Sequence, residues 1–202
     1  MEYLPAIISA IGVIITGWFT YNQRTKDKLT DLKIEKWKRE ESLKLSLKNS
    51  NIVKINGELW QLLHDLKADR VYIIQPHPLI SNAFISITLE AKRKEIVSMK
   101  EVIYKMPIAD IAVFCADLAK REFMLYKNVM EEVKDKRAQA ILSSNGTVQV
   151  IIRRLSDDRH EWVGSIVCEF TRPVDLLPDF ARKELLEAAN NIQYILPEYP
   201  QE

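Results

Sequence analysis

Glycine is scarce in this sequence, with five among 202 residues. Phosphate-binding loops and dinucleotide-binding motifs need several glycines within a short stretch, so that the backbone can approach the phosphates closely. Neither pattern is present, nor is a hydrolytic triad or a pair of carboxylates in a definable cleft. A general base at His77 or His160 is conceivable, but a solvated turn explains His160 beside Asp157 and Asp158 better. The sequence therefore predicts no enzyme.

Cysteine and histidine are also rare, with two and three residues. Cys115 and Cys168 lie far apart in apolar surroundings, which favours small buried thiols over a redox or metal role. Their scarcity agrees with a reducing compartment. His64, His77 and His160 show no ligand spacing with one another or with either cysteine. We therefore expect no metal site and no cofactor.

Most of the chain lacks an excess of either positive or negative charge. The net charge is +1, and the residues after Lys48 contain 20 cations and 22 anions. A nucleic-acid partner requires a basic patch, so we expect no nucleic acid to bind. With about 50 residues spent on the first part, the remaining residues match one ordinary domain with its own core.

The sequence does contain one long uncharged run, Leu4–Tyr21. As a helix with a rise of about 1.5 Å per residue it extends about 27 Å, close to the roughly 30 Å of a bilayer core. A secretory signal peptide opens with positive charge and ends in a small-residue cleavage site, whereas this run ends in Trp18-Phe19-Thr20-Tyr21. A buried core helix seldom lies beside such aromatic residues and a basic tract. The run predicts a membrane anchor, with the lipid bilayer as a partner.

The charges after this run predict its orientation. Between Asn22 and Lys48 there are nine cations and five anions, and no cation precedes Leu4. By the positive-inside rule, the protein crosses the inner membrane once and its C-terminal body faces the cytoplasm. The residues expected at the membrane interface are Trp18, Tyr21, Arg24, Lys26 and Lys28.

A charged helix follows the anchor, because Thr25–Leu47 contains no glycine or proline and is rich in helix formers. Beyond it, apolar residues recur at alternating steps of three and four. This seam has two interpretations that the sequence leaves open. In the first interpretation, the apolar residues pack the first helix of the domain against a sheet. In the second, they pair two chains in parallel as a homodimer. The seam consists of Ile52, Ile55, Leu59, Leu62 and Leu66.

The rest of the chain alternates between strand and helix patterns. The order is helix, two strands, helices, hairpin and helix, which predicts an α+β fold with one antiparallel sheet flanked by helices. The expected strands are Val71–Ile74, Ala83–Leu89, Phe123–Tyr126, Thr147–Leu155 and Trp162–Phe170. The expected helices are one opened by Pro107, one over Val129–Leu142, and a closing helix over Pro178–Ile195.

From about Ile52 to Ile195 this order of elements resembles a GAF-like sensory domain, of the GAF/PAS type. Arg70-Val71 with Ile73 and His77 is similar to the opening strand of membrane-tethered members. Pro78 departs from the small, flexible turn expected after that histidine. Together with the anchor and the charged helix before it, this divides the chain into three parts: an anchor at 1–24, a helical stalk at 25–51 and a GAF-like domain at 52–202. The resemblance also implies a small ligand between sheet and helices, with four pocket candidates: His77, Phe84, Phe114 and Cys115.

The layout resembles a second class, the single-pass bacteriophage holins, which carry one membrane helix and a soluble domain. Gly164-Ser165-Ile166 and Ala188-Ala189-Asn190-Asn191-Ile192 are similar to the end of that domain. Holin domains of this class lie outside the cytoplasm, whereas the basic tract predicts the reverse. The sequence therefore favours a membrane-anchored, non-catalytic sensory or interaction domain that binds a small molecule or a protein partner in the cytoplasm.

Overall fold

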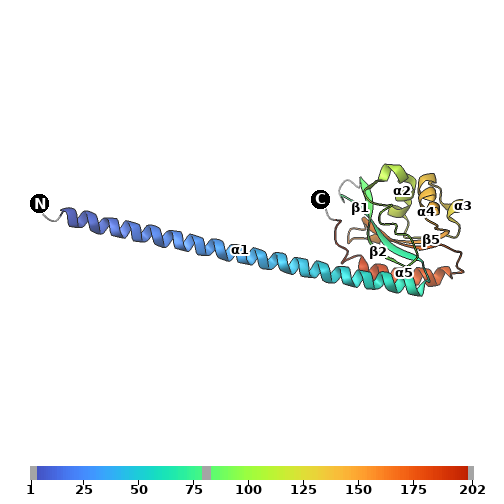
Figure 1. Cartoon of the computed structure of the whole chain (residues 1–202), viewed down its shortest axis with the longest axis horizontal. Helices are drawn as coiled ribbons and strands as arrows, with labels where there is room; N and C mark the ends of the chain where they lie inside the picture. The colour runs from blue at the N-terminus through green and yellow to red at the C-terminus, as the bar shows by residue number, and fades with distance from the viewer. Residues whose placement is uncertain (1–3, 79–82, 200–202) are drawn as a thin grey trace. The chain divides into compact units, whose positions relative to one another are not determined.

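The computed structural model describes the backbone of residues 4–78 and 83–199, and the side chains of Trp18, 33–78 and 83–199. The chain divides into two units, Met1–Asn49 and Ser50–Glu202. Helix α1, Leu4–Asp65, begins in the first unit and ends in the second (Figure 1). Its last turn is followed by Lys67, whose positive φ of 56° ends the helix in a left-handed conformation.

The predicted anchor lies on the helical backbone of α1, but only one of its side chains belongs to the described part. That side chain, Trp18, is 64% exposed. The other residues expected at the membrane interface, Tyr21, Arg24, Lys26 and Lys28, have side chains outside the described residues. In the part of the chain whose side chains the structure describes, no helix combines the length and the apolar character that crossing a membrane requires.

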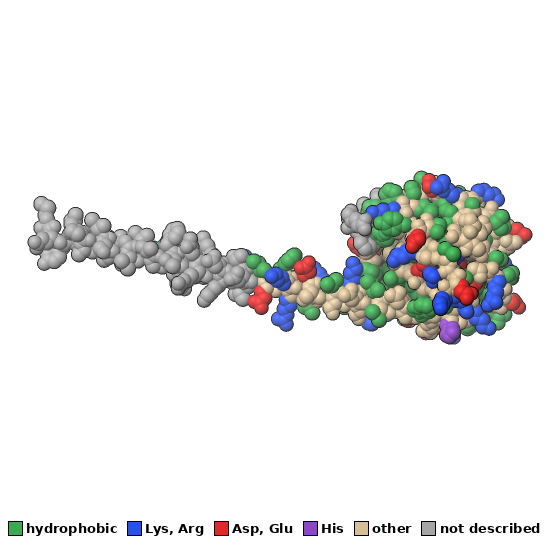
Figure 2. All heavy atoms as spheres, viewed as in Figure 1, with side chains coloured by type: hydrophobic (Ala, Val, Ile, Leu, Met, Phe, Trp, Pro, Cys, Tyr) green, Lys and Arg blue, Asp and Glu red, His purple; other side chains and the backbone are tan. Residues whose placement is uncertain are grey.

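The second unit is built on a six-stranded antiparallel sheet in the order β3-β2-β1-β6-β5-β4. The strands are β1 (Arg70–His77), β2 (Phe84–Lys92), β3 (Met106–Pro107), β4 (Phe123–Tyr126), β5 (Gln149–Ser156) and β6 (Trp162–Phe170). The α+β class, the antiparallel pair β1–β2 and the hairpin β5–β6 are confirmed. Basic and acidic side chains are interspersed over the visible face of this unit (Figure 2).

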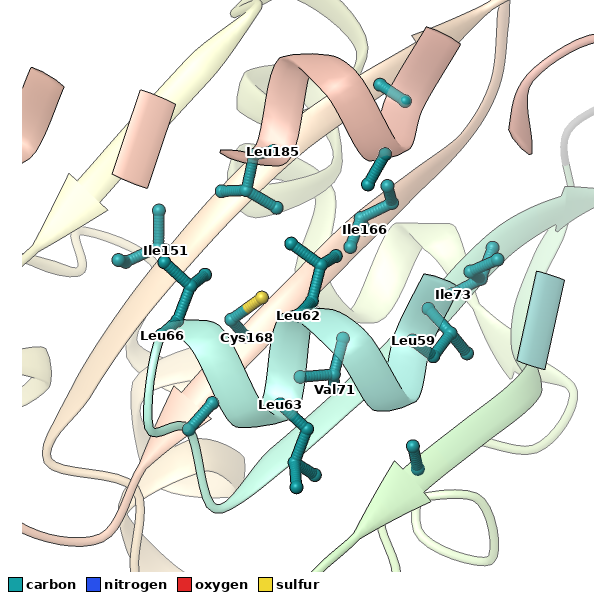
Figure 3. Close-up of a cluster of buried hydrophobic side chains, with 14 of the residues drawn as sticks. Leu59, Leu62, Leu63, Leu66, Val71, Ile73, Ile151, Ile166, Cys168 and Leu185 are labelled. Atoms are coloured by element: carbon teal, nitrogen blue, oxygen red, sulfur yellow. The ribbon is translucent and has the colours of Figure 1, made fainter. Parts of the chain in front are cut away.

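Apolar side chains form two clusters, which we call the terminal-helix cluster and the central-helix cluster. The terminal-helix cluster joins alternate residues of the sheet to the end of α1 and to α5 (Pro178–Ile192). Figure 3 shows Leu62 and Leu66 of α1 pointing toward Ile166 and Cys168 of β6. The central-helix cluster joins the other residues of the sheet to α2 (Ala112–Lys120), α3 (Val129–Glu132) and α4 (Lys136–Ser144).

The seam residues of α1 belong to the terminal-helix cluster. Ile55, Leu59 and Leu66 are 0% exposed and Leu62 is 3% exposed, whereas Ile52 is half-buried. Four of the five seam residues are therefore buried in the core of their own chain. This agrees with the interpretation in which the seam packs the helix against the sheet. Because these side chains already have partners in the same chain, a dimer would need other contacts.

Strand β1 is longer than predicted. The sequence predicts an end at Ile74, because Pro76 and Pro78 cannot donate ladder hydrogen bonds. In the structure β1 continues to His77, and Pro76 is paired with Ile85 of β2. On its other side β1 pairs with β6 only as far as Ile74. Pro76 is therefore tolerated at a position where one side of the strand has no partner.

A bulge in β2 sends its apolar residues to both clusters. The register of β1 and β2 shifts between Ile73 and Ile74, and Thr88 is the extra residue. Leu89 and Ala91 consequently pack in the terminal-helix cluster, while Ile85 and Ile87 pack in the central-helix cluster. Without the extra residue, the period of two would place all four on one face.

The central helices are shorter than predicted. The single helix expected over Val129–Leu142 is divided into α3 and α4, because the side chain of Asp135 caps α4 by accepting hydrogen bonds from the amides of Arg137 and Ala138. Pro107 opens a 3-10 turn in place of the expected α-helix. It ends β3, and this turn, η1 (Ile108–Ile111), precedes α2. The closing helix ends at Ile192, three residues earlier than expected.

Candidate ligand site

A small cavity lies inside the central-helix cluster, between the sheet and helices α2 and α4. It measures about 10 Å³, room for about one water molecule. Eight of its nine lining residues are apolar and one is a tyrosine, so the cavity offers little besides apolar surface. The lining residues are Tyr72, Ile74, Ile103, Ile111, Phe114, Ala138, Ile141, Leu142 and Val167.

The tyrosine connects the cavity to a buried polar network. Tyr72 donates a hydrogen bond from its hydroxyl to Oε1 of Glu169, at 2.5 Å. The Nε atom of Arg70 donates to Oε2 of the same carboxylate at 2.8 Å, and the Thr147 hydroxyl donates to that oxygen at 2.7 Å. Arg70 and Glu169 are 0% exposed. Burial and the neighbouring Glu169 raise the pKa of Tyr72, so the phenol stays protonated at neutral pH.

The guanidinium of Arg70 also fixes two segments that contribute to the cavity wall. Its Nη1 atom donates to the carbonyl of Val97 at 2.8 Å, and its Nη2 atom donates to the carbonyl of Asn145 at 3.1 Å. Val97 belongs to the connection that carries Ile103, and Asn145 follows the helix that carries Leu142. One buried side chain thus holds two walls of the cavity against the sheet.

Two of the predicted pocket residues lie beside this cavity. Phe114 lines it, and Cys115 is its neighbour on α2 within the central-helix cluster. Burial, with a contribution from Asp135, raises the pKa of the Cys115 thiol to about 12. The thiol is therefore protonated at neutral pH and is a poor nucleophile. Burial raises the pKa of Cys168 as well, in the terminal-helix cluster.

The other two predicted residues lie elsewhere. His77 and Phe84 are paired across β1 and β2, with ring centroids 6.0 Å apart. His77 also stacks on Tyr199 at 4.0 Å, and its Nε2 atom lies 2.9 Å from the hydroxyl of Ser86. Neither residue lines the cavity. The structure therefore brings together Phe114 and Cys115 at one place, and His77 and Phe84 at another.

Sequence reasoning missed the polar network around Glu169. A signal was present, since Arg70 and Glu169 are charged residues in otherwise apolar strands. Charges in such strands are buried only when they are paired. Their pairing depends on the register in which Arg70 lies opposite Glu169, and the sequence does not give that register. In the described part of the chain, no cluster of three or more acidic, histidine or cysteine residues is arranged to hold a metal ion.

Comparison with known proteins supports the fold. No family model matches the chain, and no curated protein sequence matches it. Solved structures do. The GAF3 domain of Slr1393 from Synechocystis sp. PCC6803, in its photoproduct state, has a TM-score of 0.58 at 13% identity, over 73% of this chain and 90% of that one. The PixJ GAF domain from Thermosynechococcus elongatus, in its blue-light absorbing form, has a TM-score of 0.60 at 10% identity, over 75% and 88%.

A third similar structure is a far-red cyanobacteriochrome photoreceptor. It has a TM-score of 0.58 at 13% identity, and the match covers 82% of this chain and 100% of that chain. The second unit therefore has a GAF-like fold, as its order of elements predicted. These structures lend no support to a membrane tether or to the holin alternative.

Proposed function

We propose that the second unit is a sensory domain that binds a small apolar molecule in the cavity between the sheet and helices α2 and α4. The observation that carries this proposal is an apolar cavity whose one polar side chain, Tyr72, already has its hydrogen-bond acceptor. A ligand there gains contact area and needs no polar partner. The similar structures are photoreceptor GAF domains by their names, which favours a sensory role over a purely structural one.

The size of the cavity sets a condition on this function. Since it holds about one water molecule, a ligand larger than that must displace a wall. The connection carrying Ile103 and the helix carrying Leu142 are the walls that Arg70 fixes. Ligand binding therefore moves segments at the surface of the domain, and that movement is the signal we propose a protein partner reads.

Filling the cavity is expected to abolish ligand binding without unfolding the domain. Ala138 on α4 lines the cavity, so Ala138→Leu adds three carbon atoms where a ligand would lie. Ala140 on the same helix is exposed, which makes Ala140→Leu the matched control. The measurement is the set of methyl chemical shifts of Ile74, Ile103 and Leu142 in the full chain, titrated with a library of apolar fragments.

We expect some fragments to shift these methyl signals in the parent and in Ala140→Leu, but none to do so in Ala138→Leu. Fragments that shift only methyl groups of the terminal-helix cluster would contradict the proposal. The same holds for an equal response of the two variants. Thermal unfolding of both variants shows whether the domain is still folded.

We also propose that Leu4–Tyr21 anchors the protein in the inner membrane, with the second unit in the cytoplasm. The supports are the uncharged run, the aromatic residues at its end and the nine cations of the following tract. The intact chain is expected to stay with the membrane fraction through a carbonate wash and to need detergent for release. Alkaline phosphatase fused after Glu202 should be inactive, and an active fusion would reverse the orientation.

A further inference from the structure

The sheet opens between β1 and β6 at the end where His77 lies. Strand β1 pairs with β6 from Arg70 to Ile74, but with β2 as far as His77. Next to this opening is Gly164 of β6, where an added Cβ atom would lie 2.9 Å from the carbonyl oxygen of Ile74. The same atom would lie 3.6 Å from Leu196. Because Gly164 has no side chain, β6 can pack closely against Ile74 and Leu196 at this point.

The segment Leu196–Tyr199, which we call the strap, lies against the open end of β1. Two contacts hold it there. The Nε2 atom of Gln75 donates to the carbonyl of Pro197 at 3.2 Å. The ring of Tyr199 stacks on the imidazole of His77 with centroids 4.0 Å apart and planes 11° from parallel. Burial and the nearby Lys105 lower the pKa of His77, which favours the neutral ring that stacks on Tyr199.

The strap pairs only one of the two polar atoms of the Gln75 side chain. This side chain is 3% exposed, and its Oε1 atom has no hydrogen-bond partner in the described part of the chain. A primary amide can donate to the carbonyl and accept from the N–H of one residue in an extended segment. Pro197 has no N–H, so the strap leaves a buried acceptor unpaired.

We propose that the open end of β1 is a docking site for an extended peptide segment of a partner protein, and that the strap is an autoinhibitory occupant of that site. The partner segment carries an aliphatic residue at the place of Leu196, a residue with a free N–H at the place of Pro197, and an aromatic residue at the place of Tyr199. Such a segment keeps the stack on His77 and satisfies both atoms of the Gln75 amide. Its polar contacts are made by the backbone of the residue at the place of Pro197, and the carbonyl and N–H of that residue both pair with the amide of Gln75.

This site is separate from the apolar cavity. His77 and Gln75 are absent from the cavity lining, and Leu196, the first residue of the strap, packs on the terminal-helix cluster. Either proposal can therefore be refuted without the other. Fragment binding in the cavity is measured on cavity residues, whereas peptide binding at β1 depends on Gln75 and His77.

The test uses the full chain and two labelled peptides, Ile-Leu-Ala-Glu-Tyr-amide and Ile-Leu-Pro-Glu-Tyr-amide, followed by fluorescence anisotropy. Tyr199→Ala removes the stacking contact of the strap, so we expect this variant to bind the Ala peptide about tenfold more tightly than the parent does. The Pro peptide should bind the same variant about fivefold more weakly, the ratio that one hydrogen bond provides. A scrambled peptide is the control for nonspecific binding.

A second variant tests the strap itself. Pro197→Ala gives the strap the missing N–H, so amide exchange at residues 198 and 199 should slow and the Ala peptide should bind more weakly than to the parent. Equal binding of the two peptides to Tyr199→Ala would overturn the proposal. So would equal binding of the Ala peptide to the parent and to Tyr199→Ala, or unchanged binding to Pro197→Ala. Thermal unfolding confirms that each variant is folded before its binding is compared.

Discussion

Glu169→Ala is expected to lower the free energy of unfolding by about 3–5 kcal/mol, the range for removing one partner of a buried ion pair. Glu169 is 0% exposed and accepts hydrogen bonds from Arg70, Tyr72 and Thr147. Without it, the guanidinium of Arg70 is a buried charge with no counter-ion, and two hydroxyl groups lose their acceptor. The measurement is urea unfolding of the full chain in detergent micelles at neutral pH.

Two further variants separate the charge from the shape. Glu169→Gln keeps the side chain volume and one acceptor oxygen, so its loss should be smaller than that of the alanine variant. Glu187→Ala removes an exposed carboxylate of α5 and should change the free energy of unfolding by no more than about 0.5 kcal/mol. A loss below about 1 kcal/mol for Glu169→Ala would mean that the network does not stabilise the fold.

The network also explains why the position of the cavity is defined. Arg70 holds the carbonyls of Val97 and Asn145, which belong to two different connections. Loss of Glu169 should therefore loosen both connections, and hydrogen exchange should rise there before it rises in β5. That order would show that the buried charges position the cavity wall in addition to stabilising the sheet.

The strand pattern was predictable from the sequence where β-branched and aromatic residues are frequent. Trp162–Phe170 combines both kinds and forms β6 at the predicted bounds, and Phe123–Tyr126, which begins and ends with an aromatic residue, forms β4. The errors arose where a single residue changes the local geometry. The cap at Asp135 divides a helix, and the bulge at Thr88 redirects half of β2. Neither effect alters the hydrophobic pattern, so periodicity alone does not detect it.

The candidate site was predictable only in part, for a related reason. Phe114 was identified only through the resemblance to GAF-like domains, which implies a ligand between the sheet and the helices. His77 and Phe84 were grouped with it, although at the open end of β1 His77 stacks on Tyr199 and Phe84 lies beside His77. Which face of the sheet a residue meets depends on register and bulges, and these follow from pairing between distant segments.

Leu59→Ala is expected to lower the free energy of unfolding by about 2–5 kcal/mol, the range for truncating a buried leucine. Leu59 is 0% exposed within the terminal-helix cluster, where it faces Val71 and Ile73 of the sheet. The loss should be the same at protein concentrations a hundredfold apart, because the contacts lie within one chain. A seam between two chains predicts a loss that depends on concentration.

The matched control for this prediction is Val53→Ala on the same helix. Val53 is 71% exposed, so its truncation removes almost no buried surface and should cost less than about 0.5 kcal/mol. If the seam pairs two chains, Leu59→Ala should instead lower the apparent mass of the protein in micelles while leaving the unfolding of each chain nearly unchanged. The two interpretations of the heptad pattern therefore predict opposite results for one substitution. The complete burial of Leu59 in its own core is the physical reason to expect the intramolecular result.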